Sequence, residues 1–371
     1  MRIGIDIKCL RYNNAGIGRY LRCILEALQK VDSENEYRLY TPADTEFKPT
    51  NPRFEVVVCK GPAHLPGILW QQTILPAAIR KDNIDVFWGP EQTLPVCNTG
   101  RTVRVLTVHD LVYKRFPKTM ERSVLLVNRF FGNRSIKVAD AICPVSEFTK
   151  GELIHFFPKI DPHKLHVVYN GAKPLATPPT TSPRNNNLLF VGSLEPRKNL
   201  PALIRALEIL HDEGTDIPLT ITGPKGWRNR SIHDIISSSS VAKNITHTGY
   251  VDDTQLSELY HTCAALVFPS VYEGFGLPVL EALAHRAPVL TTKGSSMEEV
   301  AGEFATYFDA NDPSSIAGAI RNFFEHRETA EQKFQNESAR LKELLERFCW
   351  ENSARSLLRL FETLATKGGS R

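Results

Sequence analysis

The sequence contains no apolar run that approaches the roughly 18 residues needed to cross a bilayer. Its first residues, Met-Arg-Ile-Gly-Ile-Asp-Ile-Lys, form a short alternating pattern with charges inside it, which is unlike a signal peptide. We therefore expect neither a membrane-spanning helix nor export by a signal peptide.

Paired cysteines and an excess of one charge are also missing. The seven cysteines are odd in number, widely scattered and without a Cys-x-x-Cys pair, which argues against a disulfide framework or a zinc site and favours reduced thiols in a cytoplasm. The net charge is only +4, which is too mild to predict nucleic-acid binding. Such a charge is compatible with phosphorylated substrates and anionic lipids.

What is present is a regular α/β pattern over 371 residues, a length sufficient for two domains with full cores. Short β-branched and aromatic runs alternate with helical patterns, which predicts mostly parallel, doubly wound sheets that bind ligands beyond the carboxyl ends of their strands. A Pro-rich polar stretch predicts a linker. The expected boundaries are an N-terminal domain 1–171, a linker 172–187, a C-terminal domain 188–349 and a final helix 350–371.

The predicted elements follow from these runs. In the first domain we expect strands at 2–8, 37–40, 54–58, 85–88, 103–108, 141–145 and 166–169, and helices at 16–31, 68–81 and 149–157. In the second we expect strands at 188–192, 219–222, 245–251 and 266–268, and helices at 200–211, 255–263 and 278–284.

The most informative stretch leads from a predicted strand into a helix. Gly274 and Gly276 allow a tight turn after the strand, and Pro278 suits the first turn of a helix. The free amides and the dipole of such a helix start attract anions, of which phosphate is the natural example. Glu273 lies in the turn and Glu281 about one helical turn inside, where both can accept hydrogen bonds from sugar hydroxyls. A phosphate flanked by hydroxyls is a sugar nucleotide.

This stretch, Glu-Gly-Phe-Gly-Leu-Pro-Val-Leu-Glu, resembles the signature of retaining glycosyltransferases with the GT-B fold. In particular, it resembles the large bacterial family 4, glycosyl transferases group 1, which includes mannosyltransferases of O-antigen and lipid-linked glycan synthesis. The resemblance covers almost the whole chain and implies two Rossmann-like domains that face a central cleft, with a C-terminal helix that crosses back to the first domain. It implies that the first domain, 1–171, binds the acceptor and that the second, 188–349, binds the nucleotide-sugar donor. It also implies that Glu273 contacts the donor sugar and Glu281 the nucleotide ribose.

Two further segments of the first domain match the family. Gly16 and Gly18 at a helix start let backbone amides approach a ligand closely, although a plain tight turn would use the same residues. Relatives often carry Gly-Gly-Ile-Gly here, whereas this chain has Ala15 in place of the first glycine. We therefore expect this loop to approach the donor less closely than in those relatives. His109, in Val-His-Asp-Leu, matches the family's histidine that faces donor sugar and acceptor, whereas a histidine at a strand end is otherwise structural. Asp110 is a secondary candidate that would orient the loop.

In the second domain, Arg197 and Lys198 stand just before the predicted helix 200–211, which Asn199 is expected to cap. Two cations and a helix dipole suit a diphosphate, while a solvated pair would bind nothing. In the family the matching Arg-Lys-Asn contacts the donor diphosphate. Many relatives carry Arg where this chain has Ser193, so Arg197 and Lys198 are left to neutralise the leaving group.

The resemblance also assigns backbone contacts. It implies that Tyr250 and Val251 contact the nucleotide base and that the amides around Phe275, Gly276 and Leu277 complete the diphosphate cradle. These amides and the two cations supply the positive charge, and no Asp-x-Asp triplet is present, so we expect neither a metal ion nor another cofactor. The nucleotide sugar is then a substrate.

The segment 114–137 is strongly basic, with seven Lys or Arg residues against one Glu, and it contains Phe130 and Phe131. A basic helix with exposed aromatics can lie on an anionic membrane and present an acceptor carried on a lipid. It can equally be a solvated helix whose aromatics face the core. The sequence leaves both interpretations open.

Together with the resemblance, these features predict a glycosyltransferase that moves a hexose from a nucleoside-diphosphate sugar to a hydroxyl of a glycan or lipid-linked glycan acceptor. The resemblance implies that the reaction is retaining. The stretch Gly-Ser-Leu-Glu-Pro-Arg-Lys-Asn and the loop Gly-Pro-Lys-Gly-Trp, which is expected near the donor site, resemble the mannosyltransferase branch. This resemblance favours mannose or a related deoxyhexose from a GDP-sugar in O-antigen-like surface polysaccharide synthesis. A UDP-sugar donor is the alternative, and a hydrolysing sugar-nucleotide epimerase or a two-lobed sugar-binding protein is less favoured. The expected location is the cytoplasm, with peripheral contact at the inner face of the membrane as an option.

Overall fold

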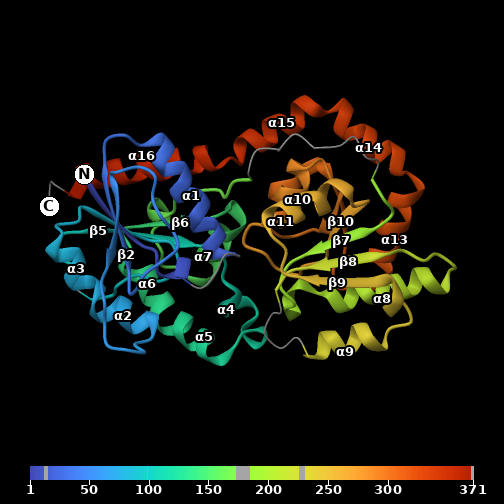
Figure 1. Ribbon diagram of the computed structural model, residues 1–371, viewed down its shortest axis with the longest axis horizontal. Helices are drawn as coiled ribbons and strands as arrows, with labels where there is room; N and C mark the ends of the chain where they lie inside the picture. The colour runs from blue at the N-terminus through green and yellow to red at the C-terminus, as the bar shows by residue number, and fades with distance from the viewer. Residues whose placement is uncertain (12–15, 98, 173–183, 225–229, 369–371) are drawn as a thin grey trace. The chain divides into compact units, whose positions relative to one another are not determined.

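The computed structural model describes residues 1–11, 16–97, 99–172, 184–224 and 230–368. The chain divides into two compact units, of which the first holds residues 1–117, 121–171 and 348–371 and the second holds 118–120 and 172–347. Each unit contains one parallel six-stranded sheet (Figure 1), so the predicted α/β class is confirmed. Of the expected linker 172–187, residues 173–183 lie outside the described residues.

The sheet of the first unit has the strand order β3-β2-β1-β4-β5-β6, so the order reverses between β1 and β4. Its strands are β1 (Arg2–Asp6), β2 (Glu36–Thr41), β3 (Phe54–Val58), β4 (Val86–Gly89), β5 (Val103–Val108) and β6 (Ala141–Pro144). Its helices are α1 (Ile17–Val31), α2 (Gly67–Thr73), α3 (Leu75–Lys81), α4 (Val112–Arg115), α5 (Arg122–Val127), α6 (Asn133–Val138), α7 (Glu147–Phe156) and α16 (Trp350–Gly368).

Helix α16 packs beside α1 although the two lie at opposite ends of the chain (Figure 1). The Trp350 ring meets the Tyr20 ring of α1 at 5.7 Å between centroids, and Phe361 lies 6.1 Å from Trp88 of β4. A Cβ added at Gly171 would lie 2.3 Å from the backbone nitrogen of Trp350, so only glycine allows the helix start to approach this closely. The last helix is therefore part of the core of the first unit.

Two predictions for the first unit are wrong in detail. The expected helix 68–81 is two helices, because Pro76 has no amide hydrogen to continue the helical ladder and the chain restarts at Leu75. The expected strand 166–169 is not a strand: the amides of His166 and Val168 bond to β6, but the carbonyl of Tyr169 accepts from Ser353 Oγ of α16 at 2.6 Å. Contact with α16 thus replaces further sheet pairing.

The sheet of the second unit has the order β12-β11-β10-β7-β8-β9. Its strands are β7 (Leu188–Val191), β8 (Leu219–Thr222), β9 (Ile245–Gly249), β10 (Ala265–Phe268), β11 (Val289–Thr292) and β12 (Ala305–Phe308). Its helices are α8 (Leu200–Asp212), α9 (Arg230–Ser238), α10 (Asp253–Thr262), α11 (Leu277–Ala284), α12 (Ser296–Ala301), α13 (Pro313–Glu325), α14 (Arg327–Asn336) and α15 (Ser338–Arg347).

Counted from its own first strand, each sheet has the order 3-2-1-4-5-6, which is the order of dinucleotide-binding folds. Every residue of β7, β8, β10 and β11 is buried, as expected for parallel strands that helices cover on both faces. The two halves therefore share a topology that no repeat in their sequences indicates. In each sheet the order reverses beside the first strand, and ligands of such folds bind at this point.

Candidate active site

The reversal point of the second sheet lies between β7 and β10, and the loops that leave these two strands carry the predicted cations and the first glutamate. Arg197 and Lys198 belong to the loop between β7 and α8, and Glu273 belongs to the loop between β10 and α11. The backbone amide of Val271 donates to the carbonyl of Arg197 at 2.9 Å, which holds the two loops together. The structure thus brings three predicted site residues into one cluster.

Glu273 is the centre of this cluster. Its Oε1 accepts from Arg197 Nη1 at 2.7 Å, from Lys198 Nζ at 2.6 Å and from Ser270 Oγ at 2.7 Å. Glu273 and Lys198 are only 8% and 7% exposed, so their ion pair is largely buried away from water. Both predicted diphosphate ligands are therefore bound to a carboxylate in this structure.

Burial and the ion pairs act on the protonation of the cluster in opposite directions. Burial alone would raise the pKa of Glu273, but Arg197, Lys198 and the hydrogen bonds from Lys198 and Ser270 outweigh it and lower the pKa to about 2. Burial lowers the pKa of Lys198 below its usual value, and the attraction of Glu273 opposes this only in part. Glu273 is therefore ionised and firmly held at neutral pH.

Two members of the cluster were not predicted from the sequence. Glu195 is buried, and its Oε2 accepts from Arg197 Nε at 3.0 Å while its Oε1 accepts from Ser193 Oγ at 2.5 Å. Ser270 is fully buried under Glu273. An acidic residue two positions before an arginine could have indicated the Glu195 pair, whereas no local signal indicates that Ser270 reaches Glu273. The four charges of Arg197, Lys198, Glu195 and Glu273 cancel.

Asn199 does not cap α8 with its side chain, contrary to the prediction. It adopts a left-handed backbone conformation with φ 57°, and its Nδ2 donates to the carbonyl of Ala310 at 2.6 Å. The side chain therefore fastens the cation loop to the segment after β12.

The N-terminus of α11 follows Glu273 directly. Gly276 is its N-cap in a left-handed conformation with φ 92°, and no side chain caps the helix start. Phe275 and Gly276 are buried and Leu277, the first helical residue, is half-buried. Glu281 lies one turn further on, where its Oε2 accepts from Tyr260 OH at 3.0 Å. Pro278 has no amide hydrogen, and the amides of Val279 and Leu280 donate to the Gly276 carbonyl, so an anion at this helix start would be bound by the amide of Leu277 and the helix dipole.

Tyr250 and Val251 follow the edge strand β9 of the same sheet. Tyr250 is 60% exposed, and the helix after it, α10, starts with a capping box between Asp252 and Gln255. The predicted loop Gly-Pro-Lys-Gly-Trp lies only partly within the described residues, because 225–229 are outside them.

The remaining predicted residues belong to the first unit. His109 follows β5, and its Nε2 lies 2.7 Å from the carbonyl of Pro90, which can only accept, so Nε2 carries the hydrogen. Burial lowers the pKa of His109, which is therefore neutral at pH 7 with Nδ1 as an acceptor. Its ring packs edge-on against Tyr20 of α1 at 4.7 Å, two residues beyond Gly18. Gly16 caps α1 with φ 55°, and Ala15 lies outside the described residues.

The reversal point of the first sheet carries a different charged cluster, which was not predicted. Lys8 Nζ lies 2.9 Å from Asp6 Oδ2 and 2.8 Å from Glu91 Oε2, and Gln71 Nε2 donates to the same oxygen of Asp6 at 2.7 Å. One lysine faces two carboxylates, so this cluster carries a net charge of −1. A diphosphate is therefore better matched to the second unit.

Comparison with known proteins decides the family. The description "Glycosyltransferase Family 4" matches residues 14–174 and "Glycosyl transferases group 1" matches residues 173–340. O-antigen chain mannosyltransferase B of Escherichia coli is 27% identical over 395 aligned positions, which cover 98% of this chain and 100% of that protein. The chain is a glycosyltransferase of this family.

A second sequence relative and a solved structure resemble this glycosyltransferase as well. The serotype-specific mannosyltransferase WbdA of Escherichia coli is 32% identical over 97% of this chain and 46% of its own length, so this chain spans about half of it. A sucrose-phosphate synthase from Thermosynechococcus elongatus has a TM-score of 0.77 over 99% of both chains at 19% identity, which shows a shared fold. The fold is GT-B, as the resemblance implied.

Two general features of the glycosyltransferase complete the description. Among the described residues, no three His, Cys, Asp or Glu side chains are grouped so that they could hold a metal ion. None of the helices within the described ranges has both the length and the apolar character that crossing a bilayer requires.

Proposed function

We propose that this glycosyltransferase transfers mannose or a related deoxyhexose from a GDP-linked sugar to a hydroxyl of a glycan or lipid-linked glycan in the synthesis of an O-antigen-like surface polysaccharide. The observation that carries this proposal is the buried Arg197-Lys198-Glu273 cluster at the reversal point of the second sheet. It occurs in a chain that aligns over 98% of its length with an O-antigen chain mannosyltransferase.

The donor diphosphate would bind where Arg197, Lys198 and the start of α11 converge. The two cations neutralise the negative charge that a departing nucleoside diphosphate develops, and the amide of Leu277 and the dipole of α11 add to this stabilisation. A diphosphate that takes up these cations partly releases Glu273, whose carboxylate can then accept hydrogen bonds from the donor sugar. This exchange couples donor binding to the positioning of Glu273.

The reaction that we propose retains the configuration at the anomeric carbon. The bond from that carbon to the diphosphate oxygen breaks, the acceptor oxygen bonds on the same face, and the departing phosphate takes the acceptor proton. We assign Glu273 to hydrogen bonds with the donor sugar rather than to attack on the anomeric carbon, because its Oε1 already accepts from two cations and Ser270 and its partial release fits a hydrogen-bonding role. His109, neutral with Nδ1 as acceptor, would position the sugar.

A transfer assay tests this proposal. The enzyme is incubated with GDP-mannose and an α-mannosyl acceptor, and the product is followed by NMR, which reads the anomeric configuration directly. We expect an α-linked product from the α-linked donor. A β-linked product would contradict retention, and transfer from UDP-sugars with none from GDP-mannose would contradict the proposed donor.

We also propose peripheral contact with the inner face of the membrane through the segment 114–137. Helix α5 has no buried residue, and Val124, Leu126 and Phe130 are 44%, 66% and 55% exposed. Arg122 and Arg129 are exposed on the same short stretch. Exposed apolar side chains next to arginines suit an anionic lipid surface.

Vesicle flotation tests the membrane contact. We expect binding to vesicles that contain anionic lipid, weak binding to neutral vesicles, and loss of binding in Leu126→Asp. Ile235→Asp provides a matched control, since Ile235 is an exposed apolar residue of the second unit. Equal binding by Leu126→Asp and the wild type would contradict the proposal.

A further inference from the structure

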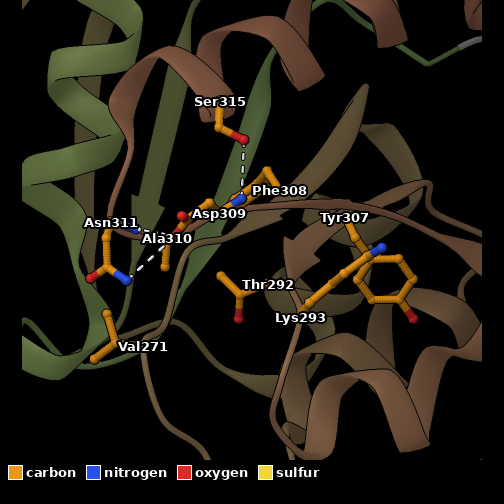
Figure 2. A pocket seen from close by; sticks show the side chains of 9 residues that line it. All are labelled: Val271, Thr292, Lys293, Tyr307, Phe308, Asp309, Ala310, Asn311 and Ser315. Atoms are coloured by element: carbon orange, nitrogen blue, oxygen red, sulfur yellow. Dashed lines mark hydrogen bonds between the residues drawn. The ribbon is translucent and has the colours of Figure 1, made fainter.

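A hollow of about 480 Å³ opens at the carboxyl ends of β10, β11 and β12, within the second unit (Figure 2). Its volume lies in the range of small-molecule sites, which is roughly 300–1,000 Å³. Figure 2 shows the Lys293 side chain extended beside the Tyr307 ring, with Val271 and Asn311 on the other side of the opening. None of these four residues belongs to the cluster around Glu273.

The side chains around the hollow offer donors, acceptors and an aromatic face. Lys293 is exposed, its Nζ lies 5.9 Å from the centroid of the Tyr307 ring, and it forms no ion pair with another described residue. Asn311 and Asp309 contribute an amide and a carboxylate, which hydrogen-bond to each other at 3.3 Å. Thr292 is buried at the base. One lysine and one aspartate leave no net charge, so the hollow matches a neutral polyhydroxylated ligand better than a phosphate.

The strand order places this hollow next to the sugar end of the proposed donor. Along the edge β9-β8-β7-β10-β11-β12, the proposed base contacts follow β9, the cations follow β7 and Glu273 follows β10. The hollow follows β10 to β12 and so continues the same line beyond Glu273. Base, diphosphate, sugar and hollow therefore succeed one another on one edge.

Hydrogen bonds connect the walls of the hollow to the donor cluster. The amide of Val271 donates to the Arg197 carbonyl at 2.9 Å, and Thr292 Oγ1 donates to the Ser270 carbonyl at 2.9 Å. Asn199 joins the cation loop to Ala310 at the rim of the hollow at 2.6 Å. The hollow and the cluster thus share backbone segments and are held at a fixed spacing.

We propose that this hollow is a subsite for the glycan acceptor and that it binds a sugar unit of the acceptor chain near the hydroxyl that receives the hexose. The Tyr307 ring packs against the sugar face, and Lys293, Asp309 and Asn311 hydrogen-bond its hydroxyls. This inference rests on the proposed function. It assigns part of acceptor recognition to the unit that also carries the donor cluster.

The test combines binding and kinetics on the full-length enzyme. α-Linked mannotriose is titrated into GDP-saturated wild type and into Lys293→Met, and binding is followed by saturation-transfer NMR. The KM for mannotriose as acceptor is measured on the same proteins. We expect Lys293→Met to weaken mannotriose binding and to raise this KM by about tenfold, as for the loss of a charge-assisted hydrogen bond. The stabilisation by GDP should be unchanged.

Matched variants separate recognition from structure. Lys243→Met removes an exposed lysine elsewhere in the second unit and should behave as the wild type. Tyr307→Phe keeps the ring but loses the hydroxyl that donates to the Gly302 carbonyl at 2.6 Å, so it should retain mannotriose binding, whereas Tyr307→Ser should lose it.

The outcomes distinguish the subsite from the proposed function. The subsite would be overturned if Lys293→Met and Tyr307→Ser bound mannotriose as well as the wild type does. It would also be overturned if the wild type bound no mannotriose, even with normal GDP binding and transfer. Absence of GDP binding and of transfer in the wild type would overturn the proposed function, while the mannotriose titration, repeated without GDP, would still decide the subsite.

Discussion

Replacing Glu273 by Gln removes the charge that pairs with Arg197 and Lys198 and keeps the size of the side chain. Arg197 retains Glu195, but Lys198 is buried and Glu273 is its ion-pair partner. Removing one partner of a buried pair typically costs about 3–5 kcal/mol. The lowering of the Glu273 pKa from 4.5 to about 2 corresponds to about 3 kcal/mol. We therefore expect Glu273→Gln to lower the free energy of unfolding of the second unit by about 3 kcal/mol.

The effect should depend on pH in a defined way. Because the pKa of Glu273 is lower in the folded state, its contribution is fully present above the unfolded value of 4.5 and is lost as the pH falls toward 2. The part of the stability difference between wild type and Glu273→Gln that comes from ionisation of Glu273 should therefore be constant at neutral pH and shrink only below about pH 4.5.

Hydrogen exchange in increasing urea measures this difference, because peptides from β7 and β10 report the second unit separately from the first. Glu258→Gln is the control, since Glu258 is exposed and should lose less than about 0.5 kcal/mol. A loss below about 1 kcal/mol for Glu273→Gln, or a difference that does not shrink as the pH falls below about 4.5, would refute the account of the cluster. The same variant should lose transfer activity, because it removes the proposed acceptor of hydrogen bonds from the donor sugar.

Other predictions address single groups. Lys198→Met should weaken GDP binding by roughly tenfold to a hundredfold, as for a lost charge-assisted hydrogen bond, and calorimetry that finds wild-type affinity would contradict this. Transfer should be unchanged by EDTA, because Arg197, Lys198 and the α11 amides supply the positive charge; a complete loss that metal restores would contradict it. An NMR titration should find the pKa of the His109 imidazole below its usual value of 6.5, and a higher pKa would argue against its burial as a neutral ring. Asp252→Ala should destabilise the second unit by about 1 kcal/mol through loss of the α10 cap, measured by urea unfolding, and an unchanged midpoint would count against the cap.

Much of the fold could be predicted from local patterns. Buried parallel strands read as short apolar runs, so most strands lie within a residue or two of their predicted bounds. The errors occur where long-range contacts decide: Tyr169 bonds to α16 instead of a strand, and Asn199 reaches Ala310 instead of capping α8. No window of the sequence contains both partners of these contacts.

In the site too, local features could be predicted from the sequence and long-range contacts could not. The sequence indicates that Arg197, Lys198 and Glu273 bear function, because each lies in a recognisable loop at a strand end. It does not indicate that Glu273 binds both cations, because the partners are about 75 residues apart and meet only through the pairing of β7 with β10. The roles of Glu195 and Ser270, and the hollow beside Lys293, likewise depend on three-dimensional packing.

The central claim is that the cation cluster of the second unit binds the diphosphate of a GDP-sugar. A thermal-shift screen of the wild type and Arg197→Ala against GDP, UDP and ADP and their sugar conjugates tests it most directly. We predict that GDP species raise the melting temperature of the wild type more than the other nucleotides do and that the increase is lost in Arg197→Ala. No shift with any nucleotide, or an equal shift in Arg197→Ala, would contradict the claim.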